Sequence, residues 1–395
     1  MNSLDHKGNI FKRTIVRLLG NEKSQFITIP LFAVLLSLIA GAIVILIMGK
    51  NPLTGFLSLL QGSGLLPKGS YAAKRGMLSD FMGLLNAITP MIFAALAVAV
   101  AFKTGLFNIG VSGQMLVAGF VASITVGYSN LPPYLAIPLV LIIGAASGAA
   151  VGALIGWLKH RFNINEVVAS IMLNYIFQYI ISFFINSYFI NAVSRQSQYV
   201  HPSAMLTLSG VELFGLKMDL PLGFLLTIPA AILVLLLLNK TRLGYEMKVV
   251  GLNKKAAHYA GISLKKNVIL AMTISGALAG LAGVTYYLGY FSSIQPRVLT
   301  SVGFDSIAVS LLGNSHPIGI LFSSLLITVI SQGSNYMSSV INVPQEISQF
   351  ITGLILLFSA CGVYIRYRVS LTKESLLNAK APVIRSKKSK GGAKE

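Results

Sequence analysis

The chain has 395 residues, of which 54% are hydrophobic and only 11% charged, and its formal net charge at pH 7 is +20. Its mean hydropathy of +0.75 is far above that of a soluble globular chain, which excludes that class and predicts a membrane protein. So large a positive charge would also fit a nucleic-acid-binding protein, so the positions of the lysines and arginines have to decide between the two.

Long stretches without Asp, Glu, Lys or Arg predict membrane-crossing helices, each of which needs about 20 mostly apolar residues. Such stretches occupy residues 104–158, 167–194, 220–239 and 267–296. We expect spans near 27–48, 83–102, 107–127, 131–158, 167–190, 222–239, 267–290, 304–313 with 317–333, and 345–365. The first span is too long for the core of a cleaved signal peptide, so it is expected to remain as an anchor.

The penultimate of these segments contains "LLGNSHPIG", whose glycines and proline predict a broken or hairpin element. The predicted fold class is therefore an all-α polytopic bundle of about ten passes with broken or re-entrant segments. From residue 83 onward, four passes precede the 191–221 segment, and four follow the 240–266 segment with the opposite starting side, which is compatible with an inverted repeat.

The basic residues are concentrated in four regions. Of 31 lysines and arginines, 23 lie before the first span, at 159–161, at 240–266 or after residue 365. All four regions are cytoplasmic if the N-terminus is inside, as the positive-inside rule predicts, so no nucleic-acid partner is expected.

We expect three parts: a basic cytoplasmic segment 1–26, a membrane domain 27–365 that includes the loop 240–266, and a basic, disordered cytoplasmic tail 366–395. The outward segments 49–82 and 191–221 either contact an external partner or are ordinary connecting loops.

The stretch "FKTGLFNIGVSGQMLVAG" at residues 102–119 places glycines and polar side chains between two apolar runs. Asn108, Ser112 and Gln114 supply polar groups where the glycines would break a helix. One interpretation is a re-entrant or discontinuous element that lines a pathway, because backbone that leaves a helix must find partners in protein or water. The other is a cytoplasmic turn in which Asn108 or Ser112 caps the next helix.

Further polar residues lie in the spans that follow. Asn165 is placed to cap a helix that starts at Glu166, whose carboxylate suits the positive helix end. Asn174 and Gln178 are four residues apart and share a face that could meet the bundle or a water-filled path. Asp305 is an intramembrane acid and hence a functional candidate, although its place in the first turn of a helix also fits a cap.

The loop 240–266 contains a short helix signal. Asn253 is expected to cap a helix over 254–260 that Gly261 ends in a left-handed conformation. Ala256, Ala257 and Ala260 give this helix a narrow surface of small side chains, from which Tyr259 projects. Such a helix either slots into a groove on another protein or lies in the membrane interface.

Several chemistries lack the residues that they require. Cys361 is the single cysteine, which excludes a disulfide within the chain and a cysteine metal cluster. The sequence has no G-x-x-x-x-G-K-[ST] loop, so the chain is not expected to hydrolyse ATP or to bind a cofactor. The histidines are scattered singly, which argues against a metal or acid–base centre; they are His6, His160, His201, His258 and His316.

Four blocks carry a resemblance to a known family: "FNIGVSGQMLVAG", "NEVVASIMLNYI", "GYEMKVVGLNKKAAHYAGISLKKNVILAMTISGALAGLAG" and "GFDSIAVSLLGNSHPIG". They resemble the permease subunits of bacterial ATP-binding-cassette (ABC) importers, in the branch that holds the ribose and branched-chain amino acid permeases. Within that branch they are most similar to permeases of nucleoside importers that work with basic-membrane-protein lipoproteins. Permeases for simple sugars look similar.

The resemblance implies a location in the bacterial cytoplasmic membrane and three partners: a cytoplasmic ATPase that binds the ATP, a second permease and a substrate-binding lipoprotein. The ATPase would grip the 251–261 region, which resembles the family's coupling helix; the residues concerned are Gly251, Asn253, Ala256, Ala257, Tyr259, Ala260 and Gly261. One departure is that the family often has an acidic residue where this chain has Ser112.

A nucleoside is neutral and polar, so amides and hydroxyls without fixed charge would suit its path. The candidates are Asn108, Gln114, Asn174, Gln178 and Ser310. An ion-coupled carrier is the alternative within transport and would depend on Glu166 or Asp305. A membrane-embedded enzyme would need paired acids, a histidine cluster or a Ser/Lys pair, which the sequence does not place together.

Overall fold

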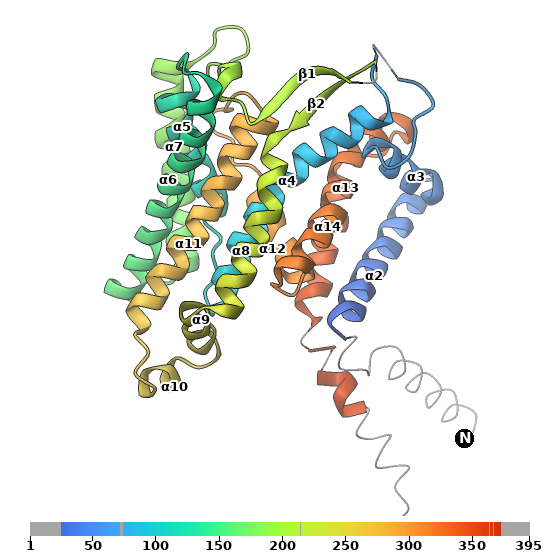
Figure 1. Cartoon of the computed structure of the whole chain (residues 1–395). Helices are drawn as coiled ribbons and strands as arrows, with labels where there is room; N and C mark the ends of the chain where they lie inside the picture. Colours follow the sequence, from blue (N-terminus) through green and yellow to red (C-terminus); the bar gives the residue numbers. More distant parts are fainter. Residues whose placement is uncertain (1–24, 72–73, 214, 363, 366, 373–395) are drawn as a thin grey trace, which may run out of the picture. The chain divides into compact units, whose positions relative to one another are not determined.

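The computed structural model describes residues 25–71, 74–213, 215–362, 364–365 and 367–372. Most of them are helical (Figure 1). The helices are α2 (Gln25–Ile47), α3 (Pro52–Gly62), α4 (Met77–Lys103), α5 (Val111–Ala122), α6 (Pro133–Phe162), α7 (Glu166–Phe184), α8 (Thr227–Lys240), α9 (Arg242–Leu252), α10 (Lys254–Tyr259), α11 (Leu264–Thr285), α12 (Val302–Leu312), α13 (Pro317–Ile341) and α14 (Glu346–Ala360). Two strands, β1 (Thr207–Leu213) and β2 (Leu216–Pro221), form an antiparallel hairpin.

The chain divides into two compact units. The first combines residues 1–36 with 357–395, and in its described part Ile29 and Val369 are buried and pack together with Ile365. The second unit, residues 37–356, contains helices α3 to α13 and the hairpin. The predicted N-terminal segment 1–26 lies outside the described residues except for its last two. Of the predicted tail 366–395, residues 367–372 are described and helical, whereas 373–395 lie outside the described part.

The predicted all-α membrane fold is confirmed. Within the described residues, seven helices are long and apolar enough to cross a membrane, and α12, α14 and α5 with the turn that follows it are shorter apolar helices. The break predicted in 304–333 is real, because α12 ends at Leu312 and α13 begins at Pro317. The hairpin of β1 and β2 was not predicted.

Two helices extend beyond the predicted spans. α4 begins at Met77, six residues earlier than expected. Its first turn is too polar to be recognised by hydropathy, and the ion pair of Asp80 with Lys68 (2.7 Å) stabilises it. α13 continues to Ile341 through a polar stretch, where Gly333 lets it pack directly on the backbone of α3 at Leu59. Hydropathy alone cannot find these extensions, because packing and pairing stabilise them.

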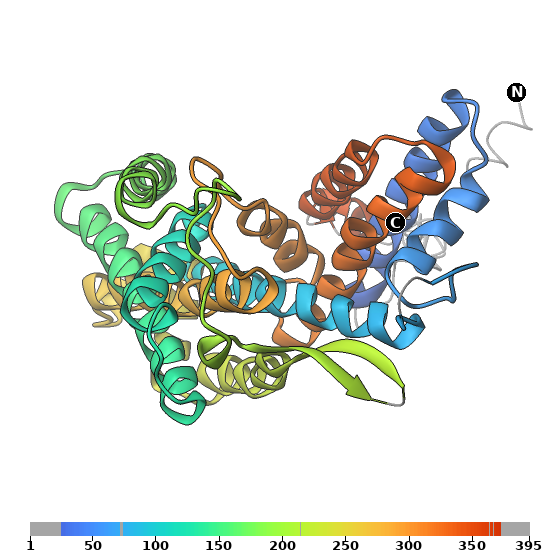
Figure 2. The same cartoon turned by 90° about the horizontal axis from the view of Figure 1, so that it is seen from above.

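α4 is the centre of the second unit. Its span is 94% buried, far more than that of any other long helix described. In Figure 2 it runs between the helices α5, α6 and α11 on one side and α12 and α13 on the other. Burial on every face is typical of a helix in the core of a bundle.

Three helices, α5, α7 and α11, continue into a π-helical turn, at Ser123–Gly127, Ile185–Phe189 and Tyr286–Tyr290. The loop at residues 197–206 donates a backbone hydrogen bond to each of these turns, at Gly127 O, Phe189 O and Leu288 O (2.8 Å each). These three helix ends therefore meet at the same end of the unit as the hairpin, opposite α9 and α10 (Figure 1).

α6 and α11 pack backbone to backbone through glycines spaced four residues apart. A Cβ on Gly148 would overlap Gly276 O, and one on Gly280 would overlap Gly144 O. Small residues at such spacing let two membrane helices approach until their backbones touch. The contact leaves no space for a methyl group on either side.

We expect Gly280→Ala to destabilise the chain by about 1–3 kcal/mol, because its methyl group would have to push the two backbones apart. Thermal unfolding in detergent measures the loss. Gly353→Ala is the matched control, since a Cβ there meets no heavy atom within 4 Å. Equal melting temperatures for the two variants would contradict the packing described for α6 and α11.

Candidate functional site

The chain between α4 and α5 is extended. α4 ends at Lys103, Gly105 has a positive φ of 69°, and residues 106–109 form neither helix nor strand before α5 begins at Val111. Gly110 is the N-cap of α5, and the side chains of Asn108 and Ser112 bond Gly110 N and Thr300 O instead of capping this helix, so the predicted capping by either residue is wrong. The discontinuous element is the interpretation that fits.

Buried amide side chains hold this extended segment. Asn108 Oδ1 accepts a hydrogen bond from Gly110 N (3.0 Å), and its Nδ2 donates to Gln114 Oε1 (3.0 Å) and to Ser275 Oγ (2.8 Å). Ser275 Oγ in turn donates to Ala97 O on α4 (2.6 Å). Asn108 thereby connects the break to α5, α11 and α4.

A second set of bonds fixes the start of α5 to its other neighbours. Asn174 Oδ1 on α7 accepts from Gly113 N (3.1 Å), and its Nδ2 donates to Ile109 O (3.1 Å). Ser112 Oγ donates to Thr300 O, just before α12 (3.0 Å). One amide side chain thus replaces the helix partners that residues 109 and 113 lack.

The predicted path residues fall into two groups. Asn108, Gln114 and Asn174 come together around the break, all at most 3% exposed, with their amide groups bonded to protein. Gln178 lies apart and donates to Arg297 O (2.5 Å), while Ser310 is fully buried in α12. Within the described part of the chain, Ser310 Oγ has no hydrogen-bond partner.

Both candidate acids, Glu166 and Asp305, lie in the first turn of a helix. Asn165 caps α7 as predicted, since its Oδ1 accepts from Val167 N (2.9 Å), and Glu166 in the first turn pairs with Lys159 of α6. Asp305 lies in the first turn of α12, whose N-cap is Ser301 and which has no side-chain cap, so its predicted capping role is wrong.

The loop from α8 to α11 folds into α9 and α10. Asn253 caps α10 as predicted, with Oδ1 accepting from Lys255 N (3.0 Å) and Ala256 N (3.1 Å), and Gly261 has a positive φ of 74°. Tyr259 is 91% exposed, whereas Ala257 is fully buried. The predicted place of Ala257 on a docking surface is therefore wrong, because no partner can reach it.

α9 ties this loop to the membrane helices. A Cβ on Gly105 would lie 3.1 Å from the Cα of Gly251, so the last turn of α9 rests on the start of the extended segment. Glu246 accepts a hydrogen bond from Asn267 of α11 (3.0 Å) and one from Arg242 (2.9 Å), and these bonds lower the pKa of its carboxyl group.

Sequence reasoning missed several members of this arrangement. Ser275 and Thr300 complete the bonds around the break, and Leu252, 87% exposed, stands beside α10 as a second large apolar side chain. Ser275 could have been noticed as a serine next to Gly276 and Ala277 in the uncharged stretch 267–296. Thr300 contributes a backbone carbonyl, which sequence cannot indicate.

Non-helical backbone among the helices of a membrane bundle is common in transport proteins. Residues 81–360 match the family described as "Branched-chain amino acid transport system / permease component". Since this match covers more than half of the chain, the chain belongs to that family. As a permease component it is the membrane-crossing part of a transport system, without an ATPase site of its own.

Individual relatives cover nearly the whole chain. It is 35% identical over 367 residues to the nucleoside ABC transporter permease protein NupB of Lactococcus lactis, covering 91% of this chain and 97% of that protein. It is 36% identical over 359 residues to the guanosine ABC transporter permease protein NupP of Bacillus subtilis, covering 90% and 99%. The glucose ABC transporter permease protein TsgB13 of Haloferax volcanii is 25% identical over 350 residues, covering 87% and 89%.

We expect Asn108→Ala to lower the free energy of unfolding by about 3 kcal/mol, because the variant leaves Gly110 N–H and Gln114 Oε1 buried without partners. Thermal unfolding and transport are measured on the same preparation. Asn335→Ala, at an exposed asparagine of α13, is the control and should change stability by less than about 0.5 kcal/mol. Lost transport at unchanged stability would instead make Asn108 a residue that contacts solute.

Proposed function

We propose that the chain forms the translocation pathway of an ATP-driven importer for nucleosides. The observation that carries this is the identity of 35% and 36%, over at least 90% of the chain, to two permeases that are named for nucleoside and guanosine transport. A relative named for glucose transport is 25% identical, which favours nucleosides over simple sugars as the substrate. The importer lies in the bacterial cytoplasmic membrane with both termini of this chain in the cytoplasm.

Three partners complete the proposed importer: a cytoplasmic ABC ATPase, a second homologous permease and a substrate-binding lipoprotein. The ATPase is proposed to bind α10, where Tyr259 and Leu252 expose large apolar side chains at one end of the unit. Exposed anchors of this kind carry most of the energy of a helix-in-groove contact.

The proposed coupling runs from α10 through α9 to the broken helix. The backbone of Gly251 touches Gly105, and Glu246 bonds Asn267 of α11. A displacement of α10 by the ATPase would therefore reach both the extended segment and α11 through direct contacts. This supports a gate at the break between α4 and α5, whose two arrangements the ATPase would bias.

We expect membrane vesicles that contain the complete importer to take up tritiated guanosine when ATP is supplied inside. Uptake should be lost on ATP depletion and kept when proton and sodium gradients are collapsed, because the energy comes from the ATPase. The reverse pattern would show an ion-coupled carrier. Uptake of glucose or ribose in place of guanosine would favour the sugar alternative.

We expect Tyr259→Asp to weaken ATPase binding by about 2 kcal/mol, roughly 30-fold, because a carboxylate replaces an exposed aromatic anchor. Co-purification from detergent extracts measures the bound ATPase. Tyr199→Asp, at another exposed tyrosine at the hairpin end of the unit, is the matched control and should leave binding unchanged. Normal ATPase binding and transport by Tyr259→Asp would overturn the docking assignment.

A further inference from the structure

A cavity of about 410 Å³ lies at the hairpin end of the second unit. It is open on one side and lined by the connection after α3, the first turns of α4, the hairpin, and residues of α13 and the turn after α11. Its volume lies within the range of sites that bind small molecules. None of the residues considered so far as path or coupling residues lines it.

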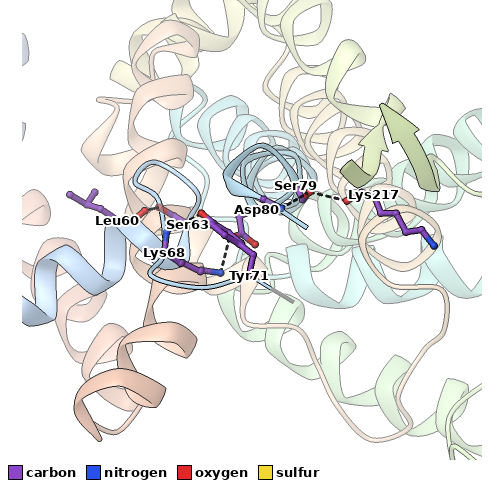
Figure 3. A network of polar contacts seen from close by, with 8 residues as sticks. Leu60, Ser63, Lys68, Tyr71, Ser79, Asp80 and Lys217 are labelled. Atoms are coloured by element: carbon purple, nitrogen blue, oxygen red, sulfur yellow. Dashed lines mark hydrogen bonds and ion pairs between the residues drawn. The ribbon is translucent and has the colours of Figure 1, made fainter. Parts of the chain in front are cut away.

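Its walls are held by fixed polar contacts. Lys68 pairs with Asp80 (2.7 Å), both side chains less than one-fifth exposed, and the Lys68 ammonium lies 4.9 Å from the centre of the Tyr336 ring. Ser79 Oγ donates to Lys217 O (2.8 Å), which joins the start of α4 to β2 (Figure 3). Asp219 Oδ1 accepts from Gly210 N (2.9 Å) across the hairpin.

The lining contains side chains of both charges, which supply hydrogen-bond donors and acceptors. Arg75 and Lys217 donate, Asp80 and Asp219 accept, and Tyr290 Oη accepts from Gln332 Nε2 (2.6 Å). An anion would face the carboxylates and a cation the basic groups. A neutral solute with both donors and acceptors is matched by this lining.

An apolar part of the lining completes the site. Leu84 and Met218 border the cavity but are only 1% and 3% exposed, so the partly exposed ring of Tyr290 is the apolar surface that a solute would meet. A flat heterocyclic base needs such a surface, and the hydroxyls of an attached sugar need the polar one. The combination suits a nucleoside better than a simple sugar, which has no flat apolar part.

We propose that this cavity is a binding site for a nucleoside on the outer side of the permease, occupied before the solute reaches the break between α4 and α5. The inference rests on the proposed function, which supplies the class of solute and the orientation. The cavity lies at the end opposite α10, where an imported solute would arrive (Figure 1).

Gly83 allows the site to be blocked without disturbing the fold. It lines the cavity from α4, and a Cβ added to it meets no heavy atom within 4 Å. A tryptophan at this position would occupy the space that a base needs. Gly353 of α14 is the matched control, because it too is helical and a Cβ there meets nothing within 4 Å.

The experiment labels the purified complete importer with 8-azidoguanosine under light and maps the modified peptides of this chain. We expect labelling within residues 62–84 or 210–219 that excess guanosine prevents. Gly83→Trp should reduce it by at least about tenfold, the loss that follows removal of one or two good contacts, and Gly353→Trp should not. Tyr290→Phe, which keeps the ring and loses the hydroxyl, should show a smaller reduction.

Unprotected labelling, or full labelling of Gly83→Trp, would overturn the proposal. Guanosine uptake is measured on the same variants, so that failure of the proposed site can be distinguished from failure of the proposed function. A wild-type importer that carries guanosine but shows no protected label here would contradict the site alone. A wild-type importer that does not carry guanosine would contradict the proposed function itself.

Discussion

The direct backbone contact between α6 and α11 is the constraint on which the bundle depends. Inside a bilayer, helices gain nothing by moving apolar side chains away from equally apolar lipid, so they associate through short-range packing. Glycines that face each other, such as Gly148 and Gly276, make that packing possible. Once α11 is placed, Ser275 reaches both Asn108 and the carbonyl of Ala97, and the cluster at the break follows from it.

The break itself answers the problem that a non-helical segment poses among membrane helices. Its backbone groups cannot turn to lipid, so they need partners within the protein. Asn174 supplies two of them from a single side chain, and Asn108 supplies one more while also joining α5 to α11. The amides that look from sequence like contacts for a solute are thus already occupied by the chain.

The membrane helices and several of their ends could be predicted from sequence, because they follow from hydropathy and capping chemistry. The apolar helices, the break at residues 313–316 and the caps at Asn165 and Asn253 are local properties that the sequence predicts, although only seven described helices are long enough to cross a membrane where about ten passes are expected. The site was less predictable, because the roles of Gln114 and Asn174 depend on which buried groups lie opposite them. The hairpin is not evident from sequence because residues 207–221 are polar enough for an ordinary loop. The burial of Ala257 is not evident either, because burial on a short helix depends on neighbours far along the chain.

The loop at residues 197–206 has a mechanical consequence for the hairpin end of the unit. It bonds to the π-helical turns after α5, α7 and α11, each through one backbone amide. A tilt of any one of these helices at that end would strain its bond to the loop, and through the loop the bonds to the other two. The three ends are therefore held at a fixed spacing, and the three helices respond there as one body.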